Sequence, residues 1–265
     1  MNKQIAIIGG GVMGGTLAQA IIKADIGYRL IVCDRDHEKL KKITDIHGGI
    51  ETTTDPSLCA SADIIFLAVK PQDFATISVG FNKDSLLCSI MAGVSIESLR
   101  RFGADKMVRM MPNTPAQVGV GFTAWTASDT ITKNEKELLE KILSCMGKHV
   151  YVGQEDDINK VTAISGSGPA YFFAMLVAFI EAGVELGFSK EDATVMATQT
   201  MKGASALIDE QTDLGQLIQR VASKGGTTEA ALKVFKDGGI DRIWQKAVRA
   251  AYDRAKELSS KHINT

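Results

Sequence analysis

The sequence lacks the paired cysteines that indicate disulfide bonds or a structural metal. Its 265 residues include four cysteines, Cys33, Cys59, Cys88 and Cys145, which are far apart in the chain. No CxxC pair and no cysteine–histidine spacing typical of a zinc site is present. Isolated, reduced cysteines are typical of cytosolic proteins, so we expect a cytoplasmic protein without a metal site.

An excess of charge of either sign is also missing. Lys and Arg number 30 and Asp and Glu 31, which gives a formal net charge of -1. This balance does not favour nucleic acid or an anionic membrane as a partner. The N-terminus lacks a signal-peptide pattern. The most apolar helix candidate, residues 170–186, carries Glu181 and Glu185 and is short for a membrane span, so we expect no membrane association.

The first half of the chain alternates between short apolar runs and helical patterns. This alternation predicts βαβ units and a largely parallel sheet, and the near-continuous apolar run at residues 64–69 suits a sheet covered on both faces. The expected strands are residues 4–8, 30–33, 64–69, 86–90, 107–111, 122–126 and 150–152, and the expected helices are residues 16–24 and 37–44.

After about Asn159 only helical periodicity remains. The expected helices are residues 171–186, 190–208, 214–221, 229–235 and 242–258. Residues 171–180 are apolar on every side and need burial on every side, which a small helical domain cannot provide alone. We therefore expect a partner subunit. The polar residues 259–265 are expected to fray.

A glycine-rich turn, Gly9-x-Gly11-x-x-Gly14, follows the first expected strand and precedes a helix. In such a turn the first glycine permits the tight bend, the second lets the backbone approach a pyrophosphate, and the third lets helix and strand pack closely. Val12 and Met13 lie between the second and third glycines. The pattern predicts a dinucleotide-binding Rossmann domain at residues 1–158, and the helical periodicity that follows predicts an all-α domain at residues 159–265.

Asp34 ends the second expected strand, 20 residues after Gly14. An acidic residue there binds the adenosine ribose hydroxyls and disfavours a 2′-phosphate, whereas the adjacent Arg35 could accept that phosphate. The two residues favour NADH slightly and leave NADPH open. Alternatively, Asp34 is a surface carboxylate at a strand end.

Two further stretches are candidates for ligand contacts. Ala68-Val69-Lys70-Pro71-Gln72 lies at the carboxyl end of a strand, where open α/β sheets bind ligands; Lys70 faces either the cofactor or solvent. Ser223-Lys224-Gly225-Gly226-Thr227-Thr228-Glu229 precedes a helix, and a glycine-freed backbone at a helix N-terminus can hold a small carboxylate. Its alternative interpretation is a turn between helices with threonine as the N-cap.

Two further motifs are Arg109-Met110-Met111-Pro112-Asn113-Thr114-Pro115 and Ser165-Gly166-Ser167-Gly168-Pro169-Ala170-Tyr171. With these motifs, the glycine turn, residues 68–72 and Gly225-Gly226-Thr227-Thr228, the chain resembles the pyrroline-5-carboxylate reductase family over nearly its whole length. The resemblance implies NADH- or NADPH-dependent reduction of L-1-pyrroline-5-carboxylate to L-proline, the last step of proline biosynthesis. It also implies an intertwined homodimer, which in some members assembles into larger rings.

The resemblance also implies roles for individual residues. The loop with Ser223 and Gly225 to Thr228 would hold the substrate carboxylate, the Thr228 hydroxyl would meet the ring nitrogen, and Asn113 would lie near the active cleft. Residues contacting the cofactor would be Gly9, Gly11, Val12, Met13, Gly14, Asp34, Arg35, Asp55, Ala68, Val69, Lys70, Pro71, Ala92 and Gly93. The sequence departs from the family at two positions, with Lys224 in place of the usual proline and Asp55 in place of a common asparagine.

The chemistry of imine reduction agrees with this set of residues. A protonated imine is already electrophilic, so no strong general acid is needed, and the four histidines, His37, His47, His149 and His262, lie outside every motif. Two alternatives remain. A dehydrogenase of the 6-phosphogluconate or β-hydroxyacid type would need a catalytic lysine, for which Lys160 is the nearest candidate, and a dinucleotide-binding redox sensor would need no substrate pocket.

Overall fold

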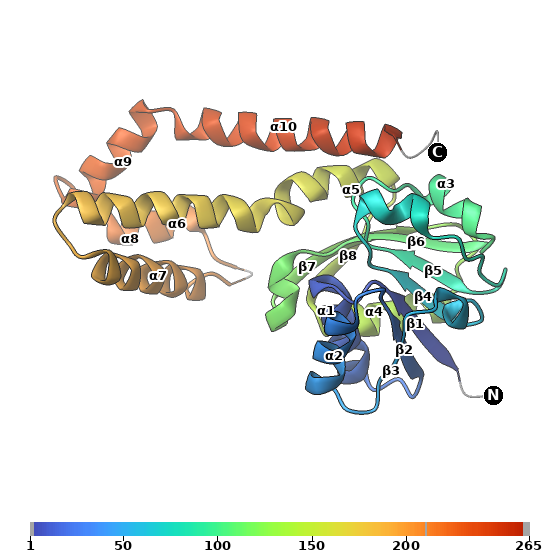
Figure 1. Ribbon diagram of the computed structural model, residues 1–265. Coiled ribbons are helices and arrows are strands. Elements are labelled where there is room, and N and C mark those ends of the chain that lie inside the picture. Colours follow the sequence, from blue (N-terminus) through green and yellow to red (C-terminus); the bar gives the residue numbers. More distant parts are fainter. Residues whose placement is uncertain (1–2, 210, 262–265) are drawn as a thin grey trace. The chain divides into compact units, whose positions relative to one another are not determined.

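The computed structural model describes residues 3–209 and 211–261, and it divides into two compact units (Figure 1). The first unit contains Met1–Ser167 together with Ala251–Thr265, and the second contains Gly168–Ala250. The last part of the chain therefore belongs, by its contacts, to the same unit as the N-terminal residues.

The first unit is built on an eight-stranded sheet with the order β3-β2-β1-β4-β5-β6-β7-β8. Its strands are β1 (Gln4–Ile8), β2 (Arg29–Cys33), β3 (Glu51–Thr53), β4 (Ile64–Leu67), β5 (Leu86–Ser89), β6 (Lys106–Met111), β7 (Gly121–Ala127) and β8 (Gly147–Tyr151). Neighbouring strands are parallel except for the antiparallel pair β6 and β7. The strand order reverses at β1, which is where open α/β sheets bind ligands.

Short helices connect these strands. They are α1 (Val12–Ala24), α2 (His37–Ile46), η1 (Pro56–Cys59), η2 (Pro71–Thr76), α3 (Ile96–Leu99), η3 (Arg100–Phe102), η4 (Thr114–Val118), α4 (Lys133–Ser144), α5 (Glu155–Val161) and the π-helical η5 (Thr162–Gly166). α4 begins with a capping box in which the side chains of Thr132 and Glu135 each accept the other residue's backbone N–H. Among the strands and α-helices, β3, α3, α4 and α5 were not predicted from the sequence.

Both faces of the sheet are buried, and alternate residues of one strand serve opposite faces. Ile5 and Ile7 of β1 pack into a core that includes Leu17 of α1. Ala6 and Ile8 pack into a second core on the other face. This two-sided burial explains why the strands are continuous apolar runs. The expected α/β fold with a helical C-terminal region is confirmed.

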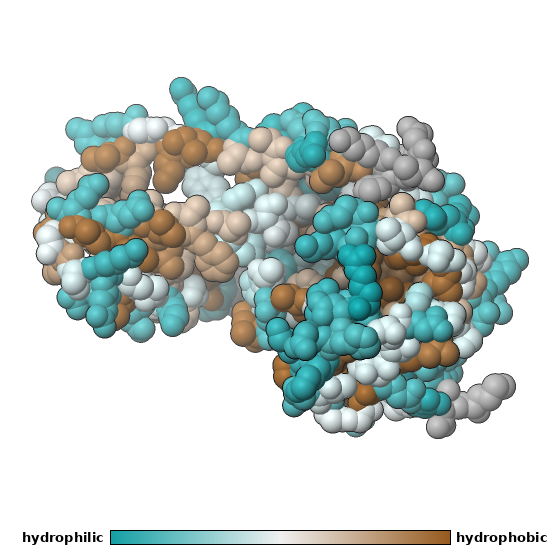
Figure 2. Space-filling model, in the orientation of Figure 1, coloured by the Kyte–Doolittle hydropathy of each residue, from teal (hydrophilic) through white to brown (hydrophobic). Residues whose placement is uncertain are grey.

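The second unit consists of helices. They are α6 (Gly168–Glu185), α7 (Lys190–Ala206), α8 (Leu214–Val221), α9 (Thr227–Asp237) and the first part of α10 (Ile240–Lys261). Large apolar side chains stay exposed on it: Phe173 of α6 is 62% exposed and Phe179 is 56% exposed. Brown apolar surface is visible over these helices in Figure 2. A single copy thus leaves α6 without the burial that its sequence needs.

Two details differ from the expectations. Ser259 is helical and hydrogen-bonded because α10 continues to Lys261; residues 262–265 lie outside the described residues. The helical run Glu155–Glu185 has 31 residues and is apolar enough to cross a membrane by length and composition alone. It is longer than the expected helix because α5 and η5 precede α6.

Gly14 of α1 tests the packing of the glycine turn. A Cβ atom built on Gly14 would overlap the carbonyl oxygen of Gly9, whereas one on Gly15 meets nothing closer than 4.0 Å. Gly14→Ala should therefore lower the free energy of unfolding by about 1–3 kcal/mol, as overpacking does. Gly15→Ala, the matched control, should leave it unchanged or raise it by up to about 1 kcal/mol. Urea unfolding of both variants measures the difference, and equal stabilities would contradict the packing.

Candidate cofactor and substrate sites

The turn after β1 lies in backbone contact with the end of β4. Gly9 has a φ of 113°, and a Cβ atom on it would lie 2.6 Å from the carbonyl carbon of Ala68 and 2.7 Å from the amide nitrogen of Val69. The Gly9 N–H donates to the Cys33 carbonyl at 2.7 Å, which ties the same turn to β2. Only glycine fits both the conformation and the close approach.

Gly11 is open where Gly9 and Gly14 are crowded. It is the N-cap of α1, and a Cβ atom on it would meet nothing within 4 Å. The first backbone N–H groups of a helix have no partner within the helix and, with the helix dipole, favour an anion. Val12 is 64% exposed at this end of α1. The turn therefore offers free space and N–H donors suited to a pyrophosphate.

Asp34, at the end of β2, is bound mainly by the protein itself. Its two carboxylate oxygens accept the N–H groups of Gly10 at 2.7 Å and Asp36 at 2.9 Å. The Lys39 ammonium lies 3.3 Å away, and the Asp34 side chain is only 8% exposed. Asp34 thus holds the glycine turn against β2, in addition to any contact with a ribose.

Arg35 follows β2 and Asp55 follows β3, two strands on the same side of β1 in the sheet, and both residues are exposed. The Arg35 guanidinium is 80% exposed and lies 3.6 Å from the Asp73 carboxylate of η2. Asp55 caps η1 by accepting the Ser57 N–H at 2.9 Å, and hydrogen bonds from Ser57 hold the pKa of Asp55 below its usual value. Asp55 therefore has a structural role in the folded chain.

Residues 68–70 form the turn between β4 and η2. The Ala68 N–H donates to the Ile8 carbonyl at 2.8 Å, which continues the β1–β4 pairing into this turn. Lys70 is the N-cap of η2, Pro71 occupies its first turn, and the Lys70 side chain is exposed. The structure thus brings Val69 and Lys70 to the edge that carries the glycine turn.

The next connection, the 90–95 turn between β5 and α3, carries Ala92 and Gly93. Gly93 has a φ of 77°, and a Cβ atom on it would lie 2.8 Å from the Leu258 Cβ of α10. The Ile90 N–H donates to the Leu67 carbonyl at 3.1 Å, so the turn begins beside the end of β4. The C-terminal part of α10 is therefore packed on this turn, which the sequence did not indicate.

Asn113 joins two of the motifs. Its amide nitrogen donates to the backbone oxygen of Ser165 at 3.2 Å and to its hydroxyl at 3.0 Å, while its amide oxygen accepts the Phe122 N–H at 2.8 Å. The side-chain amide is therefore engaged in fixing the turn after β6 against η5. Such π-helical turns are frequent at functional sites.

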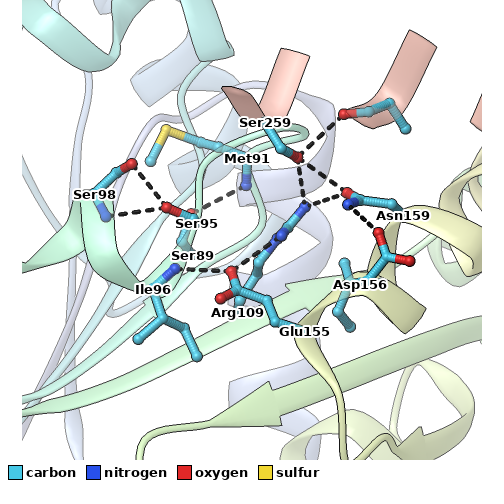
Figure 3. A network of polar contacts seen from close by, with 12 residues as sticks. Ser89, Met91, Ser95, Ile96, Ser98, Arg109, Glu155, Asp156, Asn159 and Ser259 are labelled. Carbon is cyan, nitrogen blue, oxygen red and sulfur yellow. Dashed lines mark hydrogen bonds and ion pairs between the residues drawn. The ribbon is translucent and has the colours of Figure 1, made fainter. Parts of the chain in front are cut away.

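Arg109 is a buried charge whose importance sequence reasoning missed (Figure 3). It is 2% exposed, and its two terminal nitrogens diverge: Nη1 donates to Glu155 Oε1 at 3.0 Å and Nη2 to Asn159 Oδ1 at 2.7 Å. Nη2 also lies 3.4 Å from the Ser259 hydroxyl. Burial lowers the pKa of the guanidinium and the Glu155 carboxylate opposes this effect, so the group stays charged at neutral pH. An arginine within the otherwise apolar run of residues 107–111 was the available signal.

In the second unit, the Gly225 loop leads into α9. Gly225 has a φ of 73°, Gly226 is the N-cap, and α9 begins at Thr227. Thr228 is thus in the first turn and is not the cap, unlike in the alternative interpretation of this loop. The Gly225 N–H donates to the Glu229 carboxylate at 2.6 Å. An open depression is lined by Gly225, Gly226 and the first turns of α9, with Lys233 and Lys236 at its side.

Lys160, the candidate for the alternative dehydrogenase mechanism, is held by carboxylates. Its ammonium lies 2.7 Å from Asp157 and 3.9 Å from Asp156, and the hydrogen bond with Asp157 raises its pKa. A lysine that accepts a proton needs a lowered pKa. This position therefore does not favour that alternative. Within residues 3–209 and 211–261, no three His, Cys, Asp or Glu side chains are grouped to hold a metal ion.

Comparison with known proteins agrees with the two-part organisation. Residues 4–93 match the family described as NADP oxidoreductase coenzyme F420-dependent, and residues 155–258 match pyrroline-5-carboxylate reductase dimerisation. A pyrroline-5-carboxylate reductase from Vibrio alginolyticus is 34% identical and covers 97% of this chain and 98% of its own length. The chain belongs to the pyrroline-5-carboxylate reductase family.

Solved structures show the same relationship. A pyrroline-5-carboxylate reductase from Coxiella burnetii is 36% identical, covers 98% of this chain and 99% of its own, and superposes with a TM-score of 0.86. A pyrroline carboxylate reductase from Plasmodium falciparum with NADP bound is 28% identical, covers 97% and 98%, and gives a TM-score of 0.81. The expected family is confirmed, as is the expected class, an oxidoreductase that uses a nicotinamide dinucleotide.

The open space at Gly11 generates a test of the turn. Gly11→Ala should fold with the stability of the wild type, because nothing lies within 4 Å of the new methyl group. The methyl group would occupy the approach to the N-terminus of α1 and should weaken NADH and NADPH binding by about tenfold or more, a loss of about 1.4 kcal/mol. Isothermal titration gives the affinities and thermal unfolding the stability. Unchanged affinity in the folded variant would rule out a pyrophosphate at this turn.

Proposed function

We propose that the chain reduces L-1-pyrroline-5-carboxylate to L-proline with NADH or NADPH. The observation that carries the proposal is the similarity to reductases of that name over nearly the full length of both chains. The geometry supports it because the residues implied by the resemblance lie on turns and on a helix N-terminus. A spectrophotometric assay of nicotinamide oxidation with pyrroline-5-carboxylate tests it, and no oxidation above background with either nucleotide would contradict it.

The cofactor is proposed to bind along the carboxyl edge of the sheet in the first unit. Gly11, Val12 and Met13 present the N-terminus of α1 to the pyrophosphate, and Asp34 and Arg35 lie towards its adenosine half. We keep both nucleotides in the proposal because a carboxylate and an exposed guanidinium adjoin each other at the end of β2. Val69, Lys70 and Pro71 lie on the opposite side of the glycine turn from β2.

The substrate carboxylate is proposed to bind at the N-terminus of α9. Thr227 and Thr228 occupy its first turn, where backbone N–H groups lack partners within the helix, and Gly226 exposes backbone because it has no side chain. The Ser223 hydroxyl, on the other side of the loop, would add a hydrogen bond. Lys224 brings a positive charge next to this loop, which favours an anion. Asn113 is proposed to act by holding the turn after β6.

The reaction needs a hydride on carbon and a proton on nitrogen, and the nicotinamide supplies the hydride when bound. The chain's own residues would bind and orient the reactants. The Thr228 hydroxyl is proposed to hydrogen-bond the ring nitrogen, whose positive charge disappears as the hydride arrives. Since a protonated imine is already electrophilic, the rate would depend on orientation and electrostatic contacts, which is consistent with motifs that lack histidine and cysteine.

We further propose that two copies cover each other's α6 and so form a homodimer, and that dimers can assemble into a larger ring. The dimerisation family match at residues 155–258 and the exposed apolar side chains of α6 support the dimer. A second copy, in this proposal, covers the apolar helical run Glu155–Glu185 in place of lipid.

The cytoplasm is the proposed location. We propose that residues 1–158 form the domain that binds the cofactor and that residues 159–265 form the domain that binds the substrate and makes the dimer contacts.

Thr228 carries the sharpest test of the substrate site. Thr228→Ala should lower kcat/KM for pyrroline-5-carboxylate about ten- to a hundredfold, because a hydrogen bond to a charged group contributes about 1.5–3 kcal/mol. Nucleotide affinity should stay nearly unchanged. Gly226, not Thr228, caps α9, so the variant should keep its stability. Thr228→Ser retains the hydroxyl and is the matched control: it should recover most of the activity, and an equally inactive serine variant would point to packing instead.

The dimer proposal predicts a different response for two exposed apolar residues. Phe179→Asp places a charge on α6 where the side chain is 56% exposed in one copy, and it should convert the dimer to monomer or aggregate because the charge would be buried at the interface. Ile46→Asp, at a side chain 71% exposed in α2, should leave the dimer intact. Analytical ultracentrifugation at micromolar concentration distinguishes them. A monomeric wild type, or a Phe179→Asp variant that remains dimeric, would contradict an interface at α6.

A further inference from the structure

The 90–95 turn is held from three directions within the first unit. The Ser89 hydroxyl accepts the Met91 N–H at 3.2 Å, the Glu155 carboxylate accepts the Ile96 N–H at 2.8 Å, and Leu258 packs against Gly93. Ser89 holds Met91 near the start of the turn, Glu155 holds Ile96 directly after it, and Leu258 lies against Gly93 in its middle. The backbone of Ala92 and Gly93 is therefore fixed by groups from β5, α5 and α10.

Arg109 connects two of these three contacts. The same Glu155 oxygen that accepts the Ile96 N–H also accepts Arg109 Nη1 at 3.0 Å. The other arm of the guanidinium reaches the Ser259 hydroxyl at 3.4 Å, and Ser259 directly follows Leu258. Figure 3 shows the guanidinium between these groups. Because its two arms diverge, one side chain sets both the start of α3 and the last turns of α10.

The cluster is closed by further polar contacts. The Ser259 hydroxyl donates to Asn159 Oδ1 at 3.1 Å, and that oxygen accepts Arg109 Nη2 at 2.7 Å. The Asn159 amide nitrogen donates to Asp156 at 3.2 Å, and Tyr252 of α10 donates to Asp156 at 2.7 Å. A hydrogen bond from Tyr252 keeps the pKa of Asp156 below its usual value. α5 and the end of α10 are thus joined through carboxylates and amides around one buried cation.

The position of the 90–95 turn follows from the strand order. β2, with Asp34 at its end, lies on one side of β1, and β4 and β5 lie on the other. A dinucleotide whose pyrophosphate lies at the turn after β1 and whose adenosine half lies towards β2 must extend its other half over β4 and β5. β5 is two strands from β1, or roughly 10 Å. The 90–95 turn is therefore at the nicotinamide half of the site.

We propose that Arg109 is a positioning residue for the nicotinamide half of the cofactor, acting through Glu155 and Ser259 on the Ala92–Gly93 backbone. This inference rests on the proposed cofactor site. It also gives a function to the C-terminal part of α10, which belongs to the first unit, since Leu258 packs on Gly93 and Ser259 contacts Arg109. Arg109 touches no reacting atom; its effect passes through the two contacts that fix the turn.

The test separates the two halves of the cofactor. Arg109→Lys keeps a positive charge but has one nitrogen and cannot reach both Glu155 and Ser259. Glu155→Gln removes the charge of the pair, and Ser259→Ala removes only the hydroxyl.

We expect Arg109→Lys and Glu155→Gln to weaken binding of NADH or NADPH about tenfold, and Ser259→Ala to weaken it less. The affinity for ADP, which contains only the adenosine and phosphate part, should change less than about twofold, since its contacts lie at β1 and β2. Titration calorimetry with each nucleotide gives this ratio without any substrate.

A purely structural Arg109 would behave differently. Removing a partner of a buried ion pair destabilises a protein, so a general loosening of the unit would weaken ADP and NADH together. Glu135→Gln is the matched control: it removes the charge that pairs with Lys106 of β6, the strand that also carries Arg109, and it does not touch the 90–95 turn. At an equal loss of thermal stability, Glu135→Gln should leave the ratio of the two affinities unchanged.

Three outcomes decide the proposal. A selective loss of dinucleotide affinity in Arg109→Lys and Glu155→Gln, absent from Glu135→Gln, supports it. Parallel losses for ADP and NADH, or no loss in folded variants, overturn it. If Arg109→Lys fails to fold, Ser259→Ala decides instead, because it removes only a hydroxyl and leaves no charge unpaired. A smaller but selective loss of dinucleotide affinity in Ser259→Ala supports the proposal, and an unchanged ratio of the two affinities overturns it. Because the readout is binding, a wild type without reductase activity would contradict the proposed reaction and leave this test intact.

Discussion

The backbone of the turn after β1 lies directly on the backbone at the end of β4, and the arrangement of the proposed cofactor site depends on this contact. No side chain fits between Gly9 and Ala68, so the turn can be closed only by glycine. Once it is closed, α1 begins at Gly11 with its N–H groups at the edge of the sheet. Asp34 then fixes the turn from the other side by accepting the Gly10 N–H. Three neighbouring strands thereby fix the position of the N-terminus of α1, where the cofactor pyrophosphate is proposed to bind.

The same unit contains a second constraint, the burial of Arg109. A guanidinium taken out of water must satisfy its charge and its donors locally, and here it does so with α5 and α10, which are about 50 and 150 residues further along the chain. Two helices are therefore bound to β6 at defined positions. Its Nε is buried and makes no hydrogen bond among the described residues, so the polar contacts of the guanidinium pass through its two terminal nitrogens.

Local patterns in the sequence were enough for every sheet strand except β3, for the glycine turn and for the helical second half, because apolar periodicity and glycine spacing act over a few residues. β3 was missed because Glu51-Thr52-Thr53 is short and polar. α4 was missed although Thr132-x-x-Glu135 is a capping signal that could have revealed it. The contacts of Arg109, Asn113 and Leu258 could not be predicted, since each joins segments far apart in sequence. The site roles carried by the resemblance remain predictions.

The apolar side chains of α6 remain exposed after one copy of the chain has folded. A helix that is apolar on every side must be covered on every side, yet in one copy only Gly168 of α6 is buried. Length and hydropathy alone cannot say whether lipid or protein covers such a helix. The composition of the other helices in the same small unit distinguishes the two: α7, α9 and α10 carry several charged residues each, and α8 combines apolar residues with Gln216, Gln219 and Arg220. Helices of that kind must keep one face in water while the other packs against protein, so the apolar surface they frame suits a second copy of the chain better than a bilayer.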